Sequence, residues 1–245
     1  MRKKTFIVAE IGLNHNGRLA TAQYLVYCAF YAGADACKFQ VYWSIEDCKK
    51  YNFTKPQWTE LFTLCECLGI EWFCTPFDIE AVRWLDKIGM RRWKLPSNKI
   101  VLNNEYLLKE IARARNRKHT IISTGISTDF QIKELTRILG NKNYSLLHCV
   151  SKYPTPENEL NLYKIPYLKE MFRCPVGFSD HSISTTAPLE AVKLGAEIIE
   201  KHITLNRNMR GPDHCASLVP KEFKEMVDNI REYETRTNIF SDLSN

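Results

Sequence analysis

Short apolar runs alternate with longer amphipathic segments along the whole chain. The short runs are rich in Val, Ile, Phe and Trp and predict β-strands at residues 6–12, 36–41, 72–77, 93–97, 120–125, 145–151, 175–181 and 198–204. The segments between them carry apolar residues at helical spacing and predict helices at residues 19–32, 56–69, 79–88, 104–116, 127–139, 162–172, 184–195 and 220–232. Eight consecutive strand–helix units predict an α/β protein built as a single (β/α)8 TIM barrel.

Glycine and proline positions agree with these boundaries. Five predicted helices are followed by a glycine, which readily adopts the left-handed conformation that ends a helix: Gly33, Gly69, Gly89, Gly140 and Gly195. Because no linker or low-complexity stretch divides the chain, we expect one barrel domain over residues 1–232 and a frayed tail over 233–245. A doubly wound sheet is the competing architecture, which the absence of a glycine-rich dinucleotide turn disfavours.

Composition excludes several classes of protein. The chain has 245 residues, the usual size of one TIM barrel, and is 44% hydrophobic and 25% charged. Its net charge of +6 is dispersed, and the densest basic stretch, 113–119, lies near a predicted helix end, so nucleic acid is not an expected partner. No apolar run approaches the ~20 residues of a membrane span, and the N-terminus lacks a signal-peptide pattern. We expect a cytoplasmic protein that does not bind membranes.

The nine cysteines are expected to be reduced thiols. Cys65 and Cys67 are separated by one residue, which is too close for a zinc or redox motif. Six cysteines lie inside apolar segments and are expected to be small buried residues: Cys28, Cys37, Cys65, Cys67, Cys74 and Cys149. We expect no thiol to point into a functional site.

Polar residues lie at the C-terminal ends of all eight predicted strands. These ends meet at one mouth in a parallel barrel, and alternate side chains share a face, so Ser179 pairs with His181 and Glu200 with His202. The full set is Glu10, Lys38, Thr75, Lys94, Ser97, Ser123, Ser151, Ser179, His181, Glu200 and His202. A structural protein has no need of such an arrangement, so the pattern predicts an enzyme.

Two lysines in this set indicate an anionic substrate. The ammonium groups of Lys38 and Lys94 would repel each other in a partly dry cleft unless an anion lay between them. Hydroxyl groups can donate to phosphate oxygens without adding charge. One inward serine would more often be an ordinary strand-end residue, but five hydroxyls with two lysines predict a pocket for a phosphorylated, carboxylated small molecule.

His181 and His202 are the candidate metal ligands. They end neighbouring predicted strands, and Glu10 and Asp213 are expected nearby. Two imidazoles without a thiol favour Mn²⁺, or Mg²⁺ or Co²⁺, over a closed structural zinc site. His148 has the opposite strand parity and is expected to pack between strand and helix.

Nine short motifs resemble the sialic acid synthase family, in the family's order and over nearly the whole chain. They are AEIGLNHNG (9–17), KFQ (38–40), TPFD (75–78), KLPS (94–97), STG (123–125), LHCVSKYPTP (147–156), GFSDHS (177–182), EKHITLNR (200–207) and GPDH (211–214). The combination of YPTP, SDH, EKH and GPDH is highly specific. The resemblance implies a metal-dependent TIM barrel that condenses phosphoenolpyruvate with an N-acylated hexosamine, such as N-acetylmannosamine, and releases phosphate to form a nine-carbon 2-keto acid.

The resemblance also implies roles for individual residues. It places phosphoenolpyruvate on Lys38, Thr75, Lys94, Ser97, Ser123, Ser151 and Ser179. It implies metal ligation by His181 and His202, and it puts Glu10 beside the metal and the reacting carbons. Tyr153, Glu200 and Asp213 are implied as contacts near the acceptor sugar and the metal.

Three departures from the family pattern fall on the acceptor side. The family usually follows the barrel with an antifreeze-like domain, whereas this chain ends shortly after its last predicted helix, so a homodimer or a partner chain is expected to complete the site. The connection after KFQ is shorter than in the family, and Lys99 stands where the family has an acidic residue. These departures suggest an anionic or smaller acceptor.

Three other readings stay open. The first is a related phosphoenolpyruvate-dependent synthase of 2-keto-3-deoxy sugar acids that uses another aldose. The second is a Schiff-base aldolase with Lys94 as nucleophile, which the predicted hydroxyl surroundings disfavour. The third is an inactive binding module that needs a partner chain.

Overall fold

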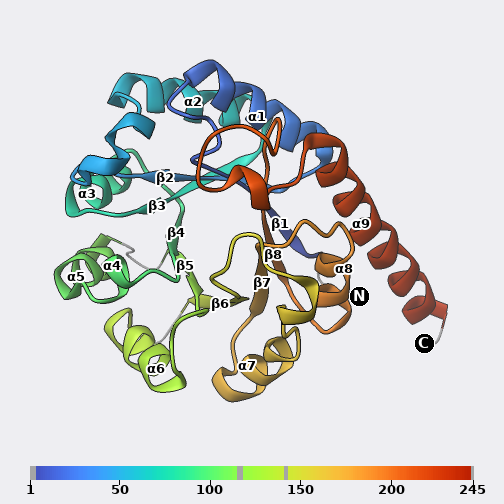
Figure 1. The fold of residues 1–245 in the computed structure, drawn as a ribbon. Coiled ribbons are helices and arrows are strands. Elements are labelled where there is room, and N and C mark those ends of the chain that lie inside the picture. Colours follow the sequence, from blue (N-terminus) through green and yellow to red (C-terminus); the bar gives the residue numbers. More distant parts are fainter. Residues whose placement is uncertain (1–3, 115–117, 141–142, 244–245) are drawn as a thin grey trace.

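The strands form a closed barrel in which every neighbouring pair is parallel (Figure 1). A computed structural model describes residues 4–114, 118–140 and 143–243. The strands are β1 (Phe6–Gly12), β2 (Ala36–Val41), β3 (Glu71–Pro76), β4 (Arg92–Leu95), β5 (His119–Ser123), β6 (Tyr144–Cys149), β7 (Val176–Asp180) and β8 (Ile198–His202). The predicted single TIM barrel is confirmed.

Helices surround the strands on the outside of the barrel (Figure 1). They are α1 (Leu19–Ala32), α2 (Lys55–Leu68), α3 (Ile79–Lys87), α4 (Lys99–Leu102), α5 (Glu105–Ala114), α6 (Asp129–Ile138), α7 (Lys164–Phe172), α8 (Ala187–Lys193) and α9 (Pro220–Leu243), with 3-10 turns η1 (Glu46–Tyr51), η2 (Glu157–Glu159) and η3 (His214–Ala216). Local signals set several ends: Thr54 and Thr128 make capping boxes for α2 and α6, and Gly33 and Gly69 end α1 and α2 in the left-handed conformation.

The last helix is longer than the sequence predicts. It was expected to end at residue 232 and be followed by a frayed tail, but α9 continues to Leu243. The buried carboxylate of Glu234 accepts a hydrogen bond from the backbone N–H of Thr5 at 2.5 Å and pairs with Arg231 at 2.9 Å. This partnership with the start of β1 explains why the helix does not fray at residue 233.

The register of neighbouring strands places the polar residues at the strand ends at the same height along the barrel axis. Glu10 of β1 lies opposite Lys38 of β2 on one side and opposite His202 of β8 on the other. Ser179 of β7 lies opposite Glu200 of β8. Because side chains alternate along each strand, the residues between these polar groups, such as Phe39, face the helices and join the apolar core. The barrel therefore supplies one polar layer at its C-terminal mouth.

Close packing of β7 against β8 depends on Gly177. A Cβ atom at this position would lie 2.3 Å from the carbonyl oxygen of Ile198 and 2.7 Å from the Leu147 side chain. Any larger residue would push β7 away from its neighbours and displace the histidines that follow on both strands.

All nine cysteines lie outside any disulfide. Cys67 and Cys28 differ from the prediction that they are buried: Cys67 is exposed and Cys28 is half-buried. Both belong to helices that cover the barrel, where apolar spacing alone does not separate the buried face from its edge. Within the described ranges, no helix has the length and apolar character needed to cross a membrane.

Candidate active site

A cavity of about 290 Å³ opens at the C-terminal mouth of the barrel. Its walls include every predicted site residue except Ser151. Those residues are Glu10, Lys38, Thr75, Lys94, Ser97, Ser123, Tyr153, Ser179, His181, Glu200, His202 and Asp213. Ser151 instead lines a neighbouring pocket between β6 and the loop after β5, and its Oγ lies against Gly125. Strand β6 ends at Cys149, so Ser151 lies in the loop beyond the strand, where strand alternation no longer sets the direction of its side chain.

Lys38 lies in a ring of oxygen atoms at the centre of the cavity. Its ammonium group is 2.8 Å from the Glu10 carboxylate and 3.7 Å from that of Glu200, and it donates to the Thr75 hydroxyl at 3.4 Å. Burial alone would lower the pKa of Lys38, but the two carboxylates outweigh it and raise that pKa above its ordinary value. Lys38 is therefore a permanent cation.

Lys94 has fewer negative neighbours. Its ammonium group donates to the Ser123 hydroxyl at 2.7 Å and to the Leu95 carbonyl at 3.0 Å, and it lies 4.0 Å from Glu200. Burial and the charge of Lys38 outweigh the attraction of Glu200, so the pKa of Lys94 is lowered.

Glu200 lies between the two ammonium groups. The sequence predicts that an anion must separate Lys38 from Lys94, and in the structure the protein's own carboxylate does so. The Ser179 hydroxyl also donates to Glu200 at 3.0 Å. Burial would raise the pKa of Glu200, but the two lysines and this hydrogen bond lower it, so Glu200 carries a negative charge.

The two histidines stand together on the other side of the cavity. The ring centroids of His181 and His202 are 5.8 Å apart. Nδ1 of His181 donates to the Val150 carbonyl at 2.7 Å, which leaves the lone pair on Nε2, where the Tyr153 hydroxyl donates at 3.0 Å. Burial, together with the charge of His202, lowers the pKa of His181 to about 4, so its imidazole is neutral at physiological pH.

Asp213 joins this group from the loop after β8. Its carboxylate is 3.9 Å from Nδ1 of His202, a buried nitrogen atom that has no hydrogen-bond partner in the described part of the chain. No group of three or more histidine, cysteine or acidic side chains in the described ranges is arranged to hold an ion. The chain thus offers two imidazoles and a nearby carboxylate, and further ligands would have to be oxygen atoms of water or substrate.

Several cavity residues were missed by the sequence reasoning. Gln40 donates to Glu10 at 2.6 Å, and its own amide oxygen accepts from the Tyr42 hydroxyl, so Tyr42, Gln40 and Glu10 form a chain of hydrogen bonds. Both residues lie at alternate positions after Lys38, a spacing that points them to the same face and could have identified them. Cys149 also lines the cavity, against the expectation of no inward thiol, and burial raises the pKa of its thiol.

Gly12 allows the side chains of Glu10, Gln40 and Asp213 to lie close together. A Cβ atom there would lie 3.1 Å from Glu10, 3.2 Å from Gln40 and 3.3 Å from Asp213, and its φ of +51° favours glycine. Ser97 accepts a hydrogen bond from the backbone N–H of Ile126 at 2.8 Å, which ties the loop after β4 to the loop after β5. The cavity is therefore held by both side-chain and backbone contacts.

Comparison with known proteins identifies the family. The NeuB family profile matches residues 43–239. The chain belongs to the NeuB family. The N,N'-diacetyllegionaminic acid synthase of Campylobacter jejuni is 37% identical, over 95% of this chain and 77% of its own length. The pseudaminic acid synthase of the same organism is 36% identical, over 95% of this chain and 75% of its own length.

A solved structure of the family has the same fold. The N-acetylneuraminic acid (sialic acid) synthetase of Leptospira borgpetersenii, crystallised with citrate, is 35% identical, and it superimposes with a TM-score of 0.87 over 94% of this chain and 84% of its own. Family membership confirms the resemblance to sialic acid synthases and the expectation of an enzyme that forms carbon–carbon bonds. Synthases of the NeuB family condense phosphoenolpyruvate with amino sugars to give nonulosonic acids.

Proposed function

We propose that the barrel cavity condenses phosphoenolpyruvate with an N-acylated hexosamine of the N-acetylmannosamine type, releasing phosphate and a sialic-type 2-keto acid. One observation carries this proposal: Lys38 and Lys94, two buried ammonium groups that each donate to a hydroxyl, share one cavity with Glu10 and the His181–His202 pair. The family membership of the chain supports it.

The lysine side of the cavity is suited to phosphoenolpyruvate. Lys38 and Lys94 supply positive charge, and Thr75, Ser123 and Ser179 supply neutral hydroxyls. Phosphate and carboxylate oxygens of the substrate would take over the hydrogen bonds that Thr75 and Ser123 now accept from the lysines. Ser97 completes this side, whereas a role for Ser151 would require contact from its neighbouring pocket.

The reaction would begin when carbon 3 of phosphoenolpyruvate attacks the open-chain sugar aldehyde. The new carbon–carbon bond leaves positive charge at carbon 2, and the aldehyde oxygen takes up a proton from solvent water; the proton that Glu10 accepts in the next step returns to solvent. Glu10, held by Lys38 and Gln40, is an anion at a fixed position and would stabilise this charge. It would also accept the proton of the water that adds to carbon 2.

Release of phosphate would complete the reaction. The tetrahedral intermediate breaks its bond between carbon 2 and the bridging oxygen, and the proton of the carbon 2 hydroxyl passes to the departing phosphate, which gives the 2-keto acid and inorganic phosphate. Lys38 and Lys94 would stabilise the negative charge that leaves. Tyr153 and Asp213, on the histidine side, would contact the acceptor sugar.

The donor atoms of the histidine side suit a divalent ion. His181 is neutral, its tautomer leaves a lone pair on Nε2, and the buried Nδ1 of His202 is without a partner in the described ranges. Two imidazoles with oxygen ligands from water or substrate fit Mn²⁺, Mg²⁺ or Co²⁺ better than a closed zinc site. Such an ion would supply Lewis-acid polarisation of the sugar aldehyde.

The residues on the acceptor side of the cavity give less support for an anionic acceptor sugar than the sequence did. Lys99, whose charge pointed to an anionic acceptor, does not line the cavity; Asn98 does. The neutral amide of Asn98 suits a neutral sugar, so N-acetylmannosamine becomes the first acceptor to test. A homodimer or partner chain that covers the mouth, and a cytoplasmic location, remain part of this proposal.

The direct test is release of phosphate from phosphoenolpyruvate with N-acetylmannosamine and Mn²⁺. We expect release that requires both the sugar and the ion, and faster turnover of this sugar than of its 6-phosphate or of non-acetylated mannose. Selectivity for the phosphorylated sugar would restore the anionic acceptor. Release without any sugar, or no release with any aldose, would contradict the condensation.

A Schiff-base aldolase is the one alternative that a specific observation favours, because the pKa of Lys94 is lowered. A Schiff-base nucleophile must present the lone pair of its nitrogen atom to the substrate. Lys94 instead donates an N–H group to the Leu95 carbonyl, which disfavours this role. Borohydride reduction in the presence of pyruvate distinguishes the two: covalent modification of Lys94 would support the aldolase, and its absence the condensation.

A further inference from the structure

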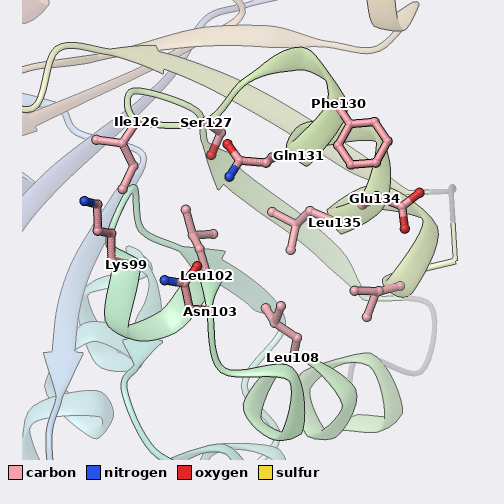
Figure 2. Close-up of a pocket in the computed structure, with 11 residues that line it drawn as sticks. Lys99, Leu102, Asn103, Leu108, Ile126, Ser127, Phe130, Gln131, Glu134 and Leu135 are labelled. Carbon is pink, nitrogen blue, oxygen red and sulfur yellow. The ribbon is translucent and has the colours of Figure 1, made fainter.

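A second concave site lies on the outside of the barrel, between α6 and the α4–α5 pair. It has a volume of about 330 Å³ and shares no lining residue with the catalytic cavity. We call it the α4–α6 groove. Its lining residues are Lys99, Leu102, Asn103, Leu108, Ile126, Ser127, Phe130, Gln131, Glu134, Leu135 and Ile138 (Figure 2).

One end of the groove is rich in hydrogen-bond donors. Figure 2 shows Lys99, Asn103 and Gln131 toward this end and Glu134 at the other. Lys99 is exposed, and its ammonium group makes no ion pair or hydrogen bond within the described ranges, although its backbone carbonyl accepts from the Asn103 N–H in the turn of α4. The Gln131 amide oxygen accepts from the backbone N–H of Thr128 at 2.9 Å, which leaves its N–H group to donate into the groove.

The remaining walls are apolar. Leu102, Leu108 and Leu135 form the inner surface, and Phe130, 72% exposed, stands at the outer edge (Figure 2). The carboxylate of Glu134 does not oppose an anion at the donor end, because it is held by Arg137 at 2.9 Å. A volume near 300 Å³ with apolar walls and a few convergent polar groups is typical of a small-molecule site.

We propose that the α4–α6 groove binds a small organic anion with an apolar body and that the bound anion acts on the catalytic cavity. Lys99 and the Gln131 amide would hold the anionic group, and the leucine wall would hold the apolar part.

The link to the catalytic cavity is short. Asn98, next to Lys99 in the chain, lines the catalytic cavity, and Ile126 donates its backbone N–H to Ser97 at 2.8 Å. A ligand that moves Lys99 or Ile126 would therefore move Ser97 and Asn98.

Another groove, between α1 and α9, provides the matched control. It is lined by Tyr24, Tyr27, Tyr31, Lys221 and Lys224, among others, and is also apolar with a lysine end. Lys224 is neutralised by Asp228 at 2.8 Å, and no lining residue of this groove touches the catalytic cavity. An anion that binds any apolar groove with a nearby lysine, without preference for the α4–α6 groove, would bind here equally well.

The test uses 8-anilinonaphthalene-1-sulfonate, an anion with an apolar body, titrated by fluorescence into the purified full chain. We expect saturable binding that is weakened at least tenfold by Lys99→Glu, retained in Lys99→Arg, and unchanged in the control Lys221→Glu. Circular dichroism establishes that each variant is folded. Equal binding in wild type and Lys99→Glu, or loss in Lys221→Glu, would overturn the site.

A second measurement tests the action on the catalytic cavity and rests on the proposed function. The KM for phosphoenolpyruvate should change at least threefold when wild type is saturated with the sulfonate, and should not change in Lys99→Glu. Binding without any effect on KM would overturn this action while leaving the site. Failure of the condensation itself would show as no turnover at all, with the fluorescence result unaffected.

Discussion

Glu200 shows how far single residues can be understood before the structure is known. Spacing along the strands predicts that Lys38 and Lys94 face one cavity and need an anion between them. It also places Glu200 at the same mouth, but not between the lysines. That position depends on the register of β8 against β7 and on the closure of the barrel through β1, which are long-range properties. The charges of the site were therefore predictable and their pairing was not.

Replacement of Glu10 tests the residue on which the proposed chemistry depends most. Glu10→Gln keeps the shape and the contact with Gln40 but removes the anion beside carbon 2. We expect turnover to fall by roughly 10²- to 10⁴-fold, the usual contribution of an acid–base group. Phosphate release measures this, and Glu60→Gln on the exposed surface of α2 is the matched control. Full turnover in Glu10→Gln would contradict its role.

His15 gives a prediction for pH. Burial, with a smaller effect of His214, lowers the pKa of His15 to about 4, and its Nδ1 accepts a hydrogen bond from the Gly17 backbone at 3.1 Å. Between pH ~6.5 and ~4 the unfolded chain therefore binds a proton that the folded chain does not. The free energy of unfolding should fall as pH drops through this window, by up to about 3 kcal/mol for this residue.

Urea unfolding between pH 7 and 4 measures this effect. His15→Phe should reduce the dependence on pH. An identical dependence in wild type and His15→Phe would show that His15 is protonated in the folded protein.

At the scale of elements, a buried ion pair joins the C-terminal ends of β7 and β8, next to the two histidines. Asp180 and Lys201 lie opposite each other on β7 and β8, are fully buried, and approach to 2.5 Å. Asp180 also accepts from the Ser182 backbone at 2.8 Å. Because each precedes a histidine, this pair holds His181 and His202 at a fixed separation.

Replacing one member of the Asp180–Lys201 pair should reduce the unfolding free energy more than replacing both members. Asp180→Asn or Lys201→Met alone leaves a buried charge without its partner, and we expect a loss of about 3–5 kcal/mol in unfolding free energy. The double variant should lose clearly less. Urea denaturation measures all three. Additive losses in the double variant would contradict a coupled pair.

Element boundaries were predictable where local signals are strong. Helix α1 and strands β1 and β2 have the predicted bounds, because the apolar spacing and the glycine after α1, Gly33, agree there. The single turn α4 was not predicted, and β4, β5, β6 and β8 each end two residues earlier than predicted. These differences depend on loop geometry at the barrel mouth, and in the loop after β6 Ser151 faces a neighbouring pocket rather than the cavity.

At the scale of the whole molecule, helix α9 near the end of the described chain is bonded to the segment that precedes β1. Arg231 of α9 donates to the Thr5 carbonyl at 2.8 Å and pairs with Asp35 before β2, and Glu234 accepts from the Thr5 backbone. These contacts close the N-terminal side of the barrel, remote from the catalytic mouth. They could not be predicted from periodicity, because the sequence between residues 233 and 243 carries no strong apolar pattern of its own.

Truncation after residue 232 should therefore destabilise the fold. Loss of the buried Glu234 contacts removes charge-assisted hydrogen bonds of about 1.5–3 kcal/mol each, which corresponds to a decrease in Tm of roughly 5–10 °C for a chain of this size. Differential scanning calorimetry measures it, with Glu234→Gln as an intermediate variant. An unchanged Tm would mean that this part of α9 contributes nothing to stability.

The central claim is that the two lysines and the two histidines serve one bound substrate. A crystal structure of the protein soaked with phosphoenolpyruvate and Mn²⁺ tests it most directly. The account predicts the phosphate and carboxylate within hydrogen-bond distance of Lys38 and Lys94, with the ion on His181 and His202 in the same cavity. Phosphoenolpyruvate bound elsewhere, or an ion that avoids both histidines, would contradict it.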